Sequence, residues 1–374
     1  MFVFLAIVIG IVIAIVFFGY PLLIFLLRSN YKKSCQRTSI LPSISVIIPS
    51  CGSAKVGEKI SNTLLQYPEH RMQIIVVYSG RDKAVLEELR SFGDKGLVEL
   101  VTEEVRTGKS NALNLGLKRA TGEICVITDS DSLLDRDAIR NLVSSFTDQK
   151  VGAVSGELVY FGSGAMNTFQ NLFFNKYKRT LKNWEAQLDS CSYAPGELLA
   201  FRRELIDSLP CGVSADDYYI ALEIRAKGYK CTSEPTAIVY EKSPQKMTGT
   251  VKRTSRVVWG TFSEAARFKH MLFNRRFGFF GLLIFPNYVF RLALLPCLFL
   301  LEVIFLSLGI MEVGLTFQTS YQIVLTISLV LILVAGRNFV KYAFSVFTGM
   351  VKGTFDFVAH RGSDYVVWEQ CKET

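Results

Sequence analysis

Two carboxylates, Asp129 and Asp131, follow directly on an apolar run at residues 124–128. The run predicts a buried strand, and side chains two residues apart on an extended chain point to the same face. Both carboxylates can therefore reach one divalent cation at the C-terminal edge of a sheet, where open α/β sheets place ligands. Hard oxygen ligands in small number suit Mg²⁺ or Mn²⁺ shared with a diphosphate. A solvated turn after a strand would look the same, so the context must decide.

The chain around this pair alternates between strand and helix patterns from residue 43 to about residue 271. We expect strands at residues 44–48, 73–78, 98–102 and 124–128. We expect helices at residues 56–66, 83–92, 110–120 and 135–146, the last with Asp135 as its N-cap. Such alternation predicts the α/β class, with a mostly parallel sheet covered by helices.

Both ends of the chain are strongly apolar. Residues 1–27 carry no charge, are long enough to span a bilayer, and are followed by a basic cluster beginning at Arg28. The order of apolar segment and charge predicts an uncleaved anchor with its N-terminus outside. Residues 279–308 and 322–335 predict two further spans, which makes three in a multi-pass protein of the cell membrane.

The organisation that follows has four parts. We expect an anchor at 1–28, a cytoplasmic catalytic domain at 40–271, two spans within 277–336, and a tail at 337–374. Within the tail, residues 339–358 mix aromatic and charged residues, which predicts an amphipathic helix in the membrane interface. A helix packed on the soluble domain is the alternative.

The composition of the chain restricts the classes of partner that we expect. The formal net charge is +9, but no basic run accompanies a recognition motif, so we expect no nucleic acid. The charge fits an anionic lipid leaflet and phosphate-bearing substrates. The eight cysteines include no C-x-x-C pair and only three histidines are present, which argues against a zinc site.

Four segments place chemistry-bearing residues in a distinctive order. They read TGKSNALNLGLKRATGEI at 107–124, YAPGELLAFRRE at 193–204, DDY at 216–218 with GY at 228–229, and RTSRVVW at 253–259. A phosphate-binding Walker A loop is excluded for the first, because Glu103 occupies the position of its required first glycine.

In these motifs the chain resembles the membrane-anchored family 2 glycosyltransferases, inverting enzymes of the GT-A fold that include cellulose and hyaluronan synthases. The resemblance covers nearly the whole chain. It implies transfer of a sugar from a nucleoside-diphosphate donor to a lipid-linked or polysaccharide acceptor at the cytoplasmic membrane face. It also implies Mg²⁺ or Mn²⁺ as cofactor.

The resemblance, joined to the chemistry of sugar transfer, assigns roles to individual residues. Asp217 is the expected general base and Asp216 its alternative, although both could simply cap a helix. Asp131 is the expected metal ligand, with Asp129 nearer the ribose or the metal's outer shell. Glu241 falls where relatives often place a residue close to the metal.

The expected donor-binding residues are Pro49, Asp82, Lys109, Asp129, Ser130, Arg253, Arg256 and Trp259. The expected acceptor-binding residues are Gly196 and Glu197. The two arginines could bind the diphosphate or form a positive cluster beside a membrane segment. Trp259 could cover the donor or anchor the chain in the membrane interface, and Lys109 could be a solvated residue at a helix start.

Departures from the family pattern leave specificity open. The aspartate that reads the nucleobase in the family is absent after the second strand or displaced to Asp82, which leaves recognition of the base open. A UDP-sugar is the favoured donor, and a GDP-sugar is the alternative. Arg253 replaces the glutamine of the Q-x-x-R-W motif, which leaves processivity open. A homo-oligomer would be needed to build a wide channel from three spans. The competing hypothesis is an inactive relative that serves as an assembly partner.

Overall fold

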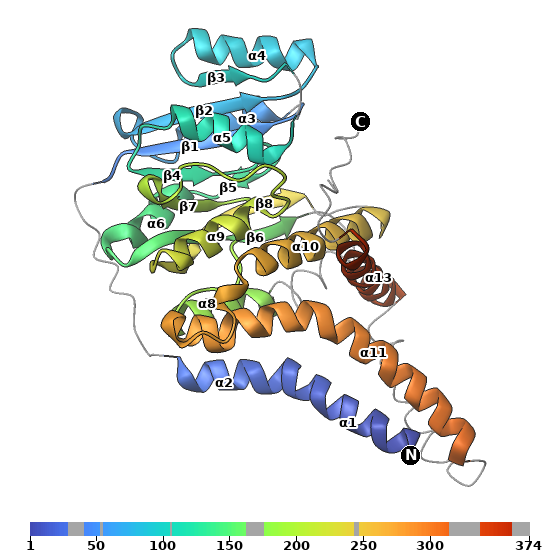
Figure 1. Cartoon of the computed structure of the whole chain (residues 1–374). Coiled ribbons are helices and arrows are strands. Elements are labelled where there is room, and N and C mark those ends of the chain that lie inside the picture. The colour runs from blue at the N-terminus through green and yellow to red at the C-terminus, as the bar shows by residue number, and fades with distance from the viewer. Residues whose placement is uncertain are drawn as a thin grey trace.

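The computed structural model describes residues 1–28, 41–52, 55–104, 107–161, 176–242, 247–313 and 337–360. Within them, eight strands form one sheet in the order β3-β2-β1-β4-β7-β6-β8-β5 (Figure 1). The strands are β1 Ile44–Ser50, β2 Met72–Tyr78, β3 Glu99–Thr102, β4 Ile124–Ile127, β5 Leu133–Leu134, β6 Val151–Phe161, β7 Leu199–Arg202 and β8 Lys230–Lys242.

The four strands predicted from the sequence form the parallel half of this sheet. β1 pairs in parallel with both β2 and β4, and β2 pairs in parallel with β3. Every residue of β4 is buried, as expected for a parallel strand covered on both faces. In the other half, β7 runs antiparallel to β4 and β6, and β5 runs antiparallel to β8. The α/β prediction is confirmed, with a sheet that is mixed.

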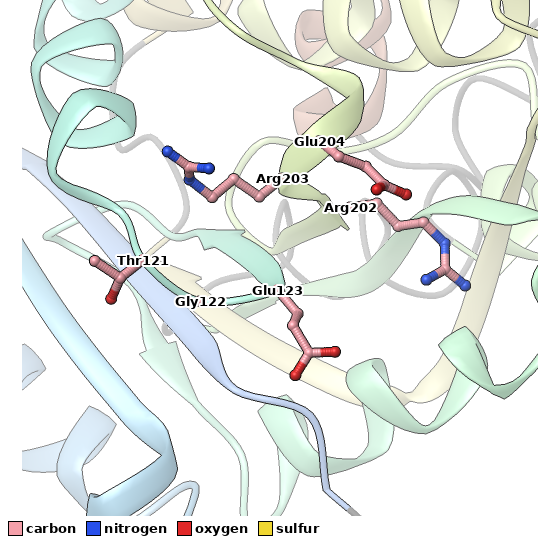
Figure 2. A pocket seen from close by; sticks show the side chains of 6 residues that line it. All are labelled: Thr121, Gly122, Glu123, Arg202, Arg203 and Glu204. Carbon is pink, nitrogen blue, oxygen red and sulfur yellow. The ribbon is translucent and has the colours of Figure 1, made fainter.

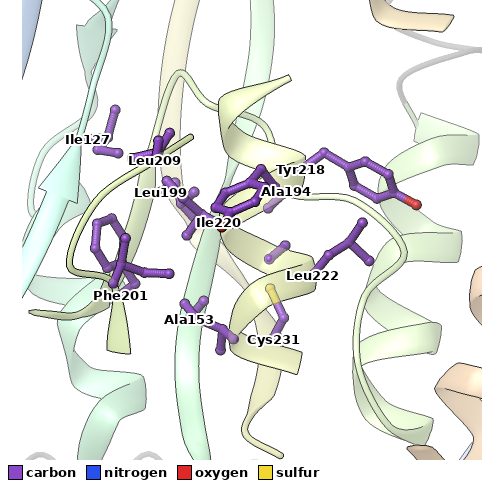
Figure 3. Close-up of a cluster of buried hydrophobic side chains, with 14 of the residues drawn as sticks. Ile127, Ala153, Ala194, Leu199, Phe201, Leu209, Tyr218, Ile220, Leu222 and Cys231 are labelled. Carbon is purple, nitrogen blue, oxygen red and sulfur yellow. The ribbon is translucent and has the colours of Figure 1, made fainter. Parts of the chain in front are cut away.

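Helices cover both faces of the sheet and give it two cores. α5 and α9 pack over one face, in a core that includes Ile127, Leu199 and Ile220 (Figure 3), and α3, α4 and α6 pack over the other on Val46 and Val76. Successive side chains along each strand therefore belong alternately to the two cores. These helices are α3 Val56–Leu64, α4 Lys83–Asp94, α5 Lys109–Arg119, α6 Ala138–Ser144 and α9 Asp216–Ala226. Short 3₁₀ turns occupy Glu69–Arg71, Ser145–Thr147, Arg203–Leu205, Lys269–Met271 and Arg275–Phe277.

The predicted start of the helix after the carboxylate pair was wrong. α6 begins at Ala138, and the N-cap position belongs to Asp137, which has a left-handed φ of 59° and makes no capping hydrogen bond. Asp135 instead donates its backbone N–H to the carbonyl of Ile238 at 2.9 Å. Because this segment pairs with β8, it stays extended, and the helix begins only at Ala138.

One long apolar helix precedes the sheet. It comprises α1 Phe2–Ala14, a π-helical turn Ile15–Gly19 and α2 Tyr20–Leu27, with a mean hydropathy of 3.2 in its most apolar window. A second candidate joins Phe280–Leu292 and Pro296–Gly309, which are bent by 55°. Within the described residues, one helix is therefore long and apolar enough to cross a membrane, or two if the bent pair is one span. The predicted span at 322–335 lies outside the described residues.

Four helices, including α11 of the bent candidate, lie between the N-terminal apolar helix and the sheet (Figure 1). α11 Phe285–Val313, which follows a π-helical turn at Phe280–Ile284, lies alongside α1, and α8 Lys176–Leu188 contacts both β8 and α2. α10 Met247–Arg267 follows β8 and packs along α13 Arg337–Ala359.

The α10–α13 contact is close because α13 presents glycine to it. A Cβ atom on Gly353 would lie 2.5 Å from the carbonyl oxygen of Ser255, whose hydroxyl donates to Asp356 at 3.3 Å. The outer face of α13 exposes Phe344 and Phe355. The helix expected at 339–358 is thus packed on α10, while its location in a membrane interface stays a prediction.

We predict that Gly353→Leu destabilises the protein by about 1–3 kcal/mol, because the side chain would be forced into the α10 backbone. Thermal unfolding in detergent measures the effect. Val351→Leu, on the exposed side of the same helix, is the matched control and should leave the midpoint unchanged. Equal midpoints for both variants would contradict the described packing.

Candidate active site

Lys109 joins two carboxylate groups that lie far apart in the sequence. It begins α5, and its Nζ lies 2.8 Å from Asp129 Oδ1 and 3.5 Å from Asp216 Oδ2. Burial alone would lower the pKa of Lys109, but these two carboxylates outweigh it and the pKa is raised. The residue is therefore a fixed cation that holds the edge of β4 against the start of α9.

The expected general base lies beside this ion pair. Asp217 Oδ2 accepts a hydrogen bond from the Gly196 N–H at 3.0 Å, and Oδ1 accepts one from the Tyr218 N–H at 2.8 Å. A Cβ atom at position 196 would lie only 3.2 Å from Asp217, so the glycine permits this approach. Desolvation and the charge of Asp216 raise the pKa of Asp217 to about 7, against the influence of Lys109. A carboxylate that ionises near neutral pH suits general-base chemistry.

Arg253 joins the remaining acidic residues. Its guanidinium lies 2.8 Å from Glu197 Oε1 and 3.2 Å from Glu241 Oε1, and it lies over the ring of Tyr160 at 5.3 Å. Burial raises the pKa of Glu241 to about 8, although Arg253 opposes this shift. The residue that replaces the family's glutamine is thus the ionic link between the predicted acceptor side and the end of β8.

Three other residues that we predicted to bind the donor are close in sequence to Asp129 or Arg253. Ser130 is buried between the two aspartates of the strand edge. Arg256 and Trp259 follow Arg253 on α10, and Trp259 is buried. Burial argues against Trp259 as an exposed anchor in the membrane interface.

The last two predicted donor-binding residues lie at the other strands. Pro49 is in β1, opposite Val77 of β2. Asp82 caps α4, because its Oδ1 accepts hydrogen bonds from the backbone N–H groups of Ala84 and Val85 at 2.9 and 3.4 Å. The side chain therefore caps the helix, and recognition of the nucleobase by Asp82 stays a prediction.

The sequence did not predict that Lys59 belongs to this region. It is completely buried, and its Nζ donates to Thr128 Oγ1 at 2.7 Å and to Ser132 Oγ at 3.1 Å. Burial lowers the pKa of Lys59 to about 7, while Asp129 and Asp131 act in the opposite direction. The lysine thus lies beneath the carboxylate pair and fixes the chain on both sides of it.

Glu103 is a second residue whose place the sequence did not reveal. It follows β3 and accepts hydrogen bonds from Thr107 Oγ1 at 3.1 Å and from Asn111 Nδ2 at 2.6 Å, and it also contacts the Ser79 hydroxyl. Ser79 directly follows β2, the strand after which the resemblance led us to expect an aspartate. A carboxylate does lie beside that strand end, but it comes from the neighbouring strand.

The carboxylate pair fits a divalent cation that is shared with a ligand. Partial desolvation and the charge of Asp129 raise the pKa of Asp131, whose side chain stays accessible, so a cation would relieve a real repulsion. In the described part of the chain, no cluster of three or more His, Cys, Asp or Glu side chains could hold a metal by itself. The remaining ligands would have to be diphosphate oxygens and water, which is the usual situation of Mg²⁺.

A cavity at the opposite end of β4 does not belong to this site (Figure 2). Two of its charged side chains already serve the fold: Glu123 accepts a hydrogen bond from Ser43, and Arg202 donates to the carbonyls of Val151 and Phe146. The lining residues are Thr121, Gly122, Glu123, Arg202, Arg203 and Glu204.

Residues 42–260, more than half of the chain, match the family model described as Glycosyltransferase like family 2. The chain belongs to glycosyltransferase family 2. This membership confirms the resemblance drawn from the four motifs, all of which begin inside the matched range.

Individual proteins support the same assignment. The chain is 27% identical over 231 residues to the probable glycosyltransferase YdaM of Bacillus subtilis (strain 168), covering 58% of this chain and 54% of that protein. It is 22% identical over 233 residues to the poly-beta-1,6-N-acetyl-D-glucosamine synthase of Staphylococcus aureus (strain COL), covering 61% and 56%. The chain thus spans about half the length of the curated relatives it matches.

A solved structure resembles nearly the whole chain. The mannosyltransferase PcManGT from Pyrobaculum calidifontis, in complex with GDP-Man and Mn²⁺, superposes with a TM-score of 0.71 at 23% identity. The match covers 95% of this chain and 99% of that one. The likeness confirms the predicted GT-A type of fold for this chain.

We predict that Lys109→Met shifts the ionisation of Asp217 to higher pH, because Lys109 lowers that pKa in the folded protein. The acidic limb of the pH–rate profile for nucleotide release from a sugar donor should move upward. Lys118→Met removes an exposed lysine from the same helix and should leave the limb in place. An unchanged limb in Lys109→Met would contradict the electrostatic coupling.

Proposed function

We propose that this protein is a metal-dependent, inverting glycosyltransferase that moves a sugar from a nucleoside diphosphate to an acceptor hydroxyl at a membrane face. The observation that carries the proposal is the Lys109 bridge, which brings the carboxylates at the end of β4 next to Asp217, a carboxyl group with a pKa of about 7. The strand edge suits the leaving diphosphate, and the carboxyl group of Asp217 suits the attacking hydroxyl.

The donor side would be built on Asp129 and Asp131. Mg²⁺ or Mn²⁺ bound there would neutralise the charge that develops on the leaving diphosphate. Lys109 and Arg253 add positive charge from two further elements and could contact the phosphates directly. A UDP-sugar is the favoured donor and a GDP-sugar the alternative; the PcManGT complex holds GDP-Man and Mn²⁺.

The acceptor side would be built on Gly196, Glu197 and Asp217. The acceptor oxygen attacks the anomeric carbon, the bond from that carbon to the diphosphate oxygen breaks, and its electron pair leaves with the nucleoside diphosphate. The hydroxyl proton passes to Asp217, whose orientation is fixed by the Gly196 N–H. Attack from the side opposite the leaving group inverts the anomeric centre.

The membrane arrangement forms part of the same proposal. The apolar helix at Phe2–Leu27 would anchor the chain, with its N-terminus outside and the sheet domain in the cytoplasm. The acceptor would be a lipid-linked sugar or a growing polysaccharide, and one relative is named as a polysaccharide synthase. A growing polysaccharide would require processive transfer, and a wide channel for it would require several copies of the chain.

We predict that Asp131→Asn lowers sugar transfer by about 100-fold or more, because it removes an anionic oxygen ligand from the cation site. Transfer of radiolabelled sugar from UDP- and GDP-sugars into a membrane extract measures it. Asp137→Asn is the control, since asparagine tolerates the left-handed backbone at that nearby position. Full activity in a folded Asp131→Asn protein would remove the basis for the assigned site.

We predict that Asp217→Asn lowers the transfer rate by about 10²–10⁴-fold while donor binding is retained. In the unmodified protein the rate should fall as the pH is lowered through about 7, because the raised pKa leaves Asp217 protonated below that value. Steady-state rates from pH 5 to 9 test both statements. A pH-independent rate would assign the base to another group.

A further inference from the structure

The end of the N-terminal apolar helix is buried in the catalytic part of the chain. Tyr20 and Ile24, one turn apart on α2, are 7% and 0% exposed, and both belong to the same core as Phe201 of β7. Leu26 of the same helix is 69% exposed. Attachment to a bilayer requires an apolar surface but no buried polar side chain. One face of α2 is therefore part of the protein interior, and its tyrosine needs a separate explanation.

Tyr20 binds a buried carboxylate. Its hydroxyl donates to Glu185 Oε1 at 2.7 Å, and Glu185 Oε2 accepts a hydrogen bond from the Ser192 N–H at 3.1 Å. Glu185 lies on α8 and is 1% exposed. Because a buried carboxylate is costly unless its oxygens are hydrogen-bonded, both donors are important to it. One side chain thus joins the N-terminal helix to the segment that follows α8.

The helix that carries this carboxylate is fixed on two sides. Toward the sheet, Lys182 of α8 forms a buried ion pair with Glu157 of β6 at 3.2 Å and donates to the carbonyl of Gly156 at 2.8 Å. Toward the N-terminal helix, the Tyr177 hydroxyl donates to the carbonyl of Phe17 at 3.0 Å, inside the π-helical turn. α8 accordingly contacts both β8 and α2 (Figure 1). Its carboxylate therefore has a defined position relative to the sheet.

The segment after α8 leads directly to the expected base. Its first fixed point is the Ser192 N–H, and shortly after it the Gly196 N–H donates to Asp217 Oδ2 at 3.0 Å. Between them, Tyr193 stacks on Tyr288 of α11, with ring centroids 6.0 Å apart and an interplanar angle of 10°. A carboxylate holds the segment at each end. A displacement at its start is therefore expected to reach the carboxylate at its end.

We propose that Tyr20 and Glu185 are positioning residues for sugar transfer, through which the N-terminal helix orients the general base Asp217. The inference rests on the proposed function and gives this helix a role besides attachment to a membrane. The hydroxyl orients the carboxylate, the carboxylate holds the Ser192 N–H, and the segment that follows presents the Gly196 N–H to Asp217. Loss of the link should lower the rate of transfer and leave donor binding unchanged.

The test compares Tyr20→Phe, Glu185→Leu and Glu185→Gln in the full chain in detergent, well below the unfolding midpoint of each. Tyr20→Phe and Glu185→Leu should each lower transfer of radiolabelled sugar at saturating donor by about 10-fold or more, because small displacements of a base are costly. The double variant should be no slower than Glu185→Leu, since both changes break one link. Glu185→Gln keeps an oxygen for the Ser192 N–H and should retain most of the rate.

Two further measurements accompany the rates. Mn²⁺-dependent binding of UDP- and GDP-sugars to the same samples reports on the donor site and should match the unmodified protein in every variant. Tyr67→Phe is the matched control, because it removes a buried tyrosine hydroxyl that donates to the carbonyl of Pro42 at 2.9 Å in the other core. Its rate of transfer should be unchanged.

The outcomes separate the inference from the proposed function. A full rate in folded Tyr20→Phe overturns the inference, and so does a rate loss that is matched by Tyr67→Phe or by an equal loss of donor binding. Additive losses in the double variant also overturn it. If Glu185→Leu fails to fold, Tyr20→Phe still decides, because it removes one hydroxyl only. An unmodified protein that neither binds a nucleotide sugar nor transfers sugar would instead contradict the proposed function.

Discussion

The structure depends on balancing a dense group of negative charges. Six carboxylates gather where β4, α9 and β8 meet, and three buried or half-buried cations, Lys59, Lys109 and Arg253, lie among them. Unpaired charges in such surroundings are costly, so each cation fixes the elements that carry its partners. The carboxylates are Asp129, Asp131, Glu197, Asp216, Asp217 and Glu241.

This balance also sets the chemistry. Negative charge in excess at the strand edge favours a divalent cation, and burial together with the charge of Asp216 raises the pKa of Asp217 to about 7. Because Arg253 comes from α10, and α10 is packed on α13, helices outside the sheet contribute to the electrostatics of the site. The same helices lie next to the apolar part of the chain.

Much of the fold could be predicted because the parallel strands are buried on both faces and appear as short apolar runs. The carboxylate pair was visible for the same reason, since it ends such a run. The order of the antiparallel strands was not predictable, because no periodicity records that β7 inserts between β4 and β6. Contacts that depend on this order, such as Arg253 with Glu197, were therefore beyond the sequence.

Single polar residues were harder to assign than strands. Lys59 precedes Ile60 on a helix whose buried side includes both, and a lysine in an amphipathic pattern ordinarily points to solvent. Asp82 could read a nucleobase, yet it caps α4, because a carboxylate before a helix finds free N–H groups nearby. The partners of Lys59 are tertiary, so the chain gives no local sign of them, whereas the partners of Asp82 are the N–H groups of the helix that directly follows it.

The central claim is that the β4 carboxylates hold a divalent cation together with a nucleoside diphosphate. Electron paramagnetic resonance of Mn²⁺, titrated into the detergent-purified protein with and without UDP or GDP, tests it most directly. The account predicts bound Mn²⁺ that depends on the nucleotide and is lost in Asp131→Asn. Absence of bound Mn²⁺ with either nucleotide, in folded protein, would contradict the account and support an inactive relative that acts as an assembly partner.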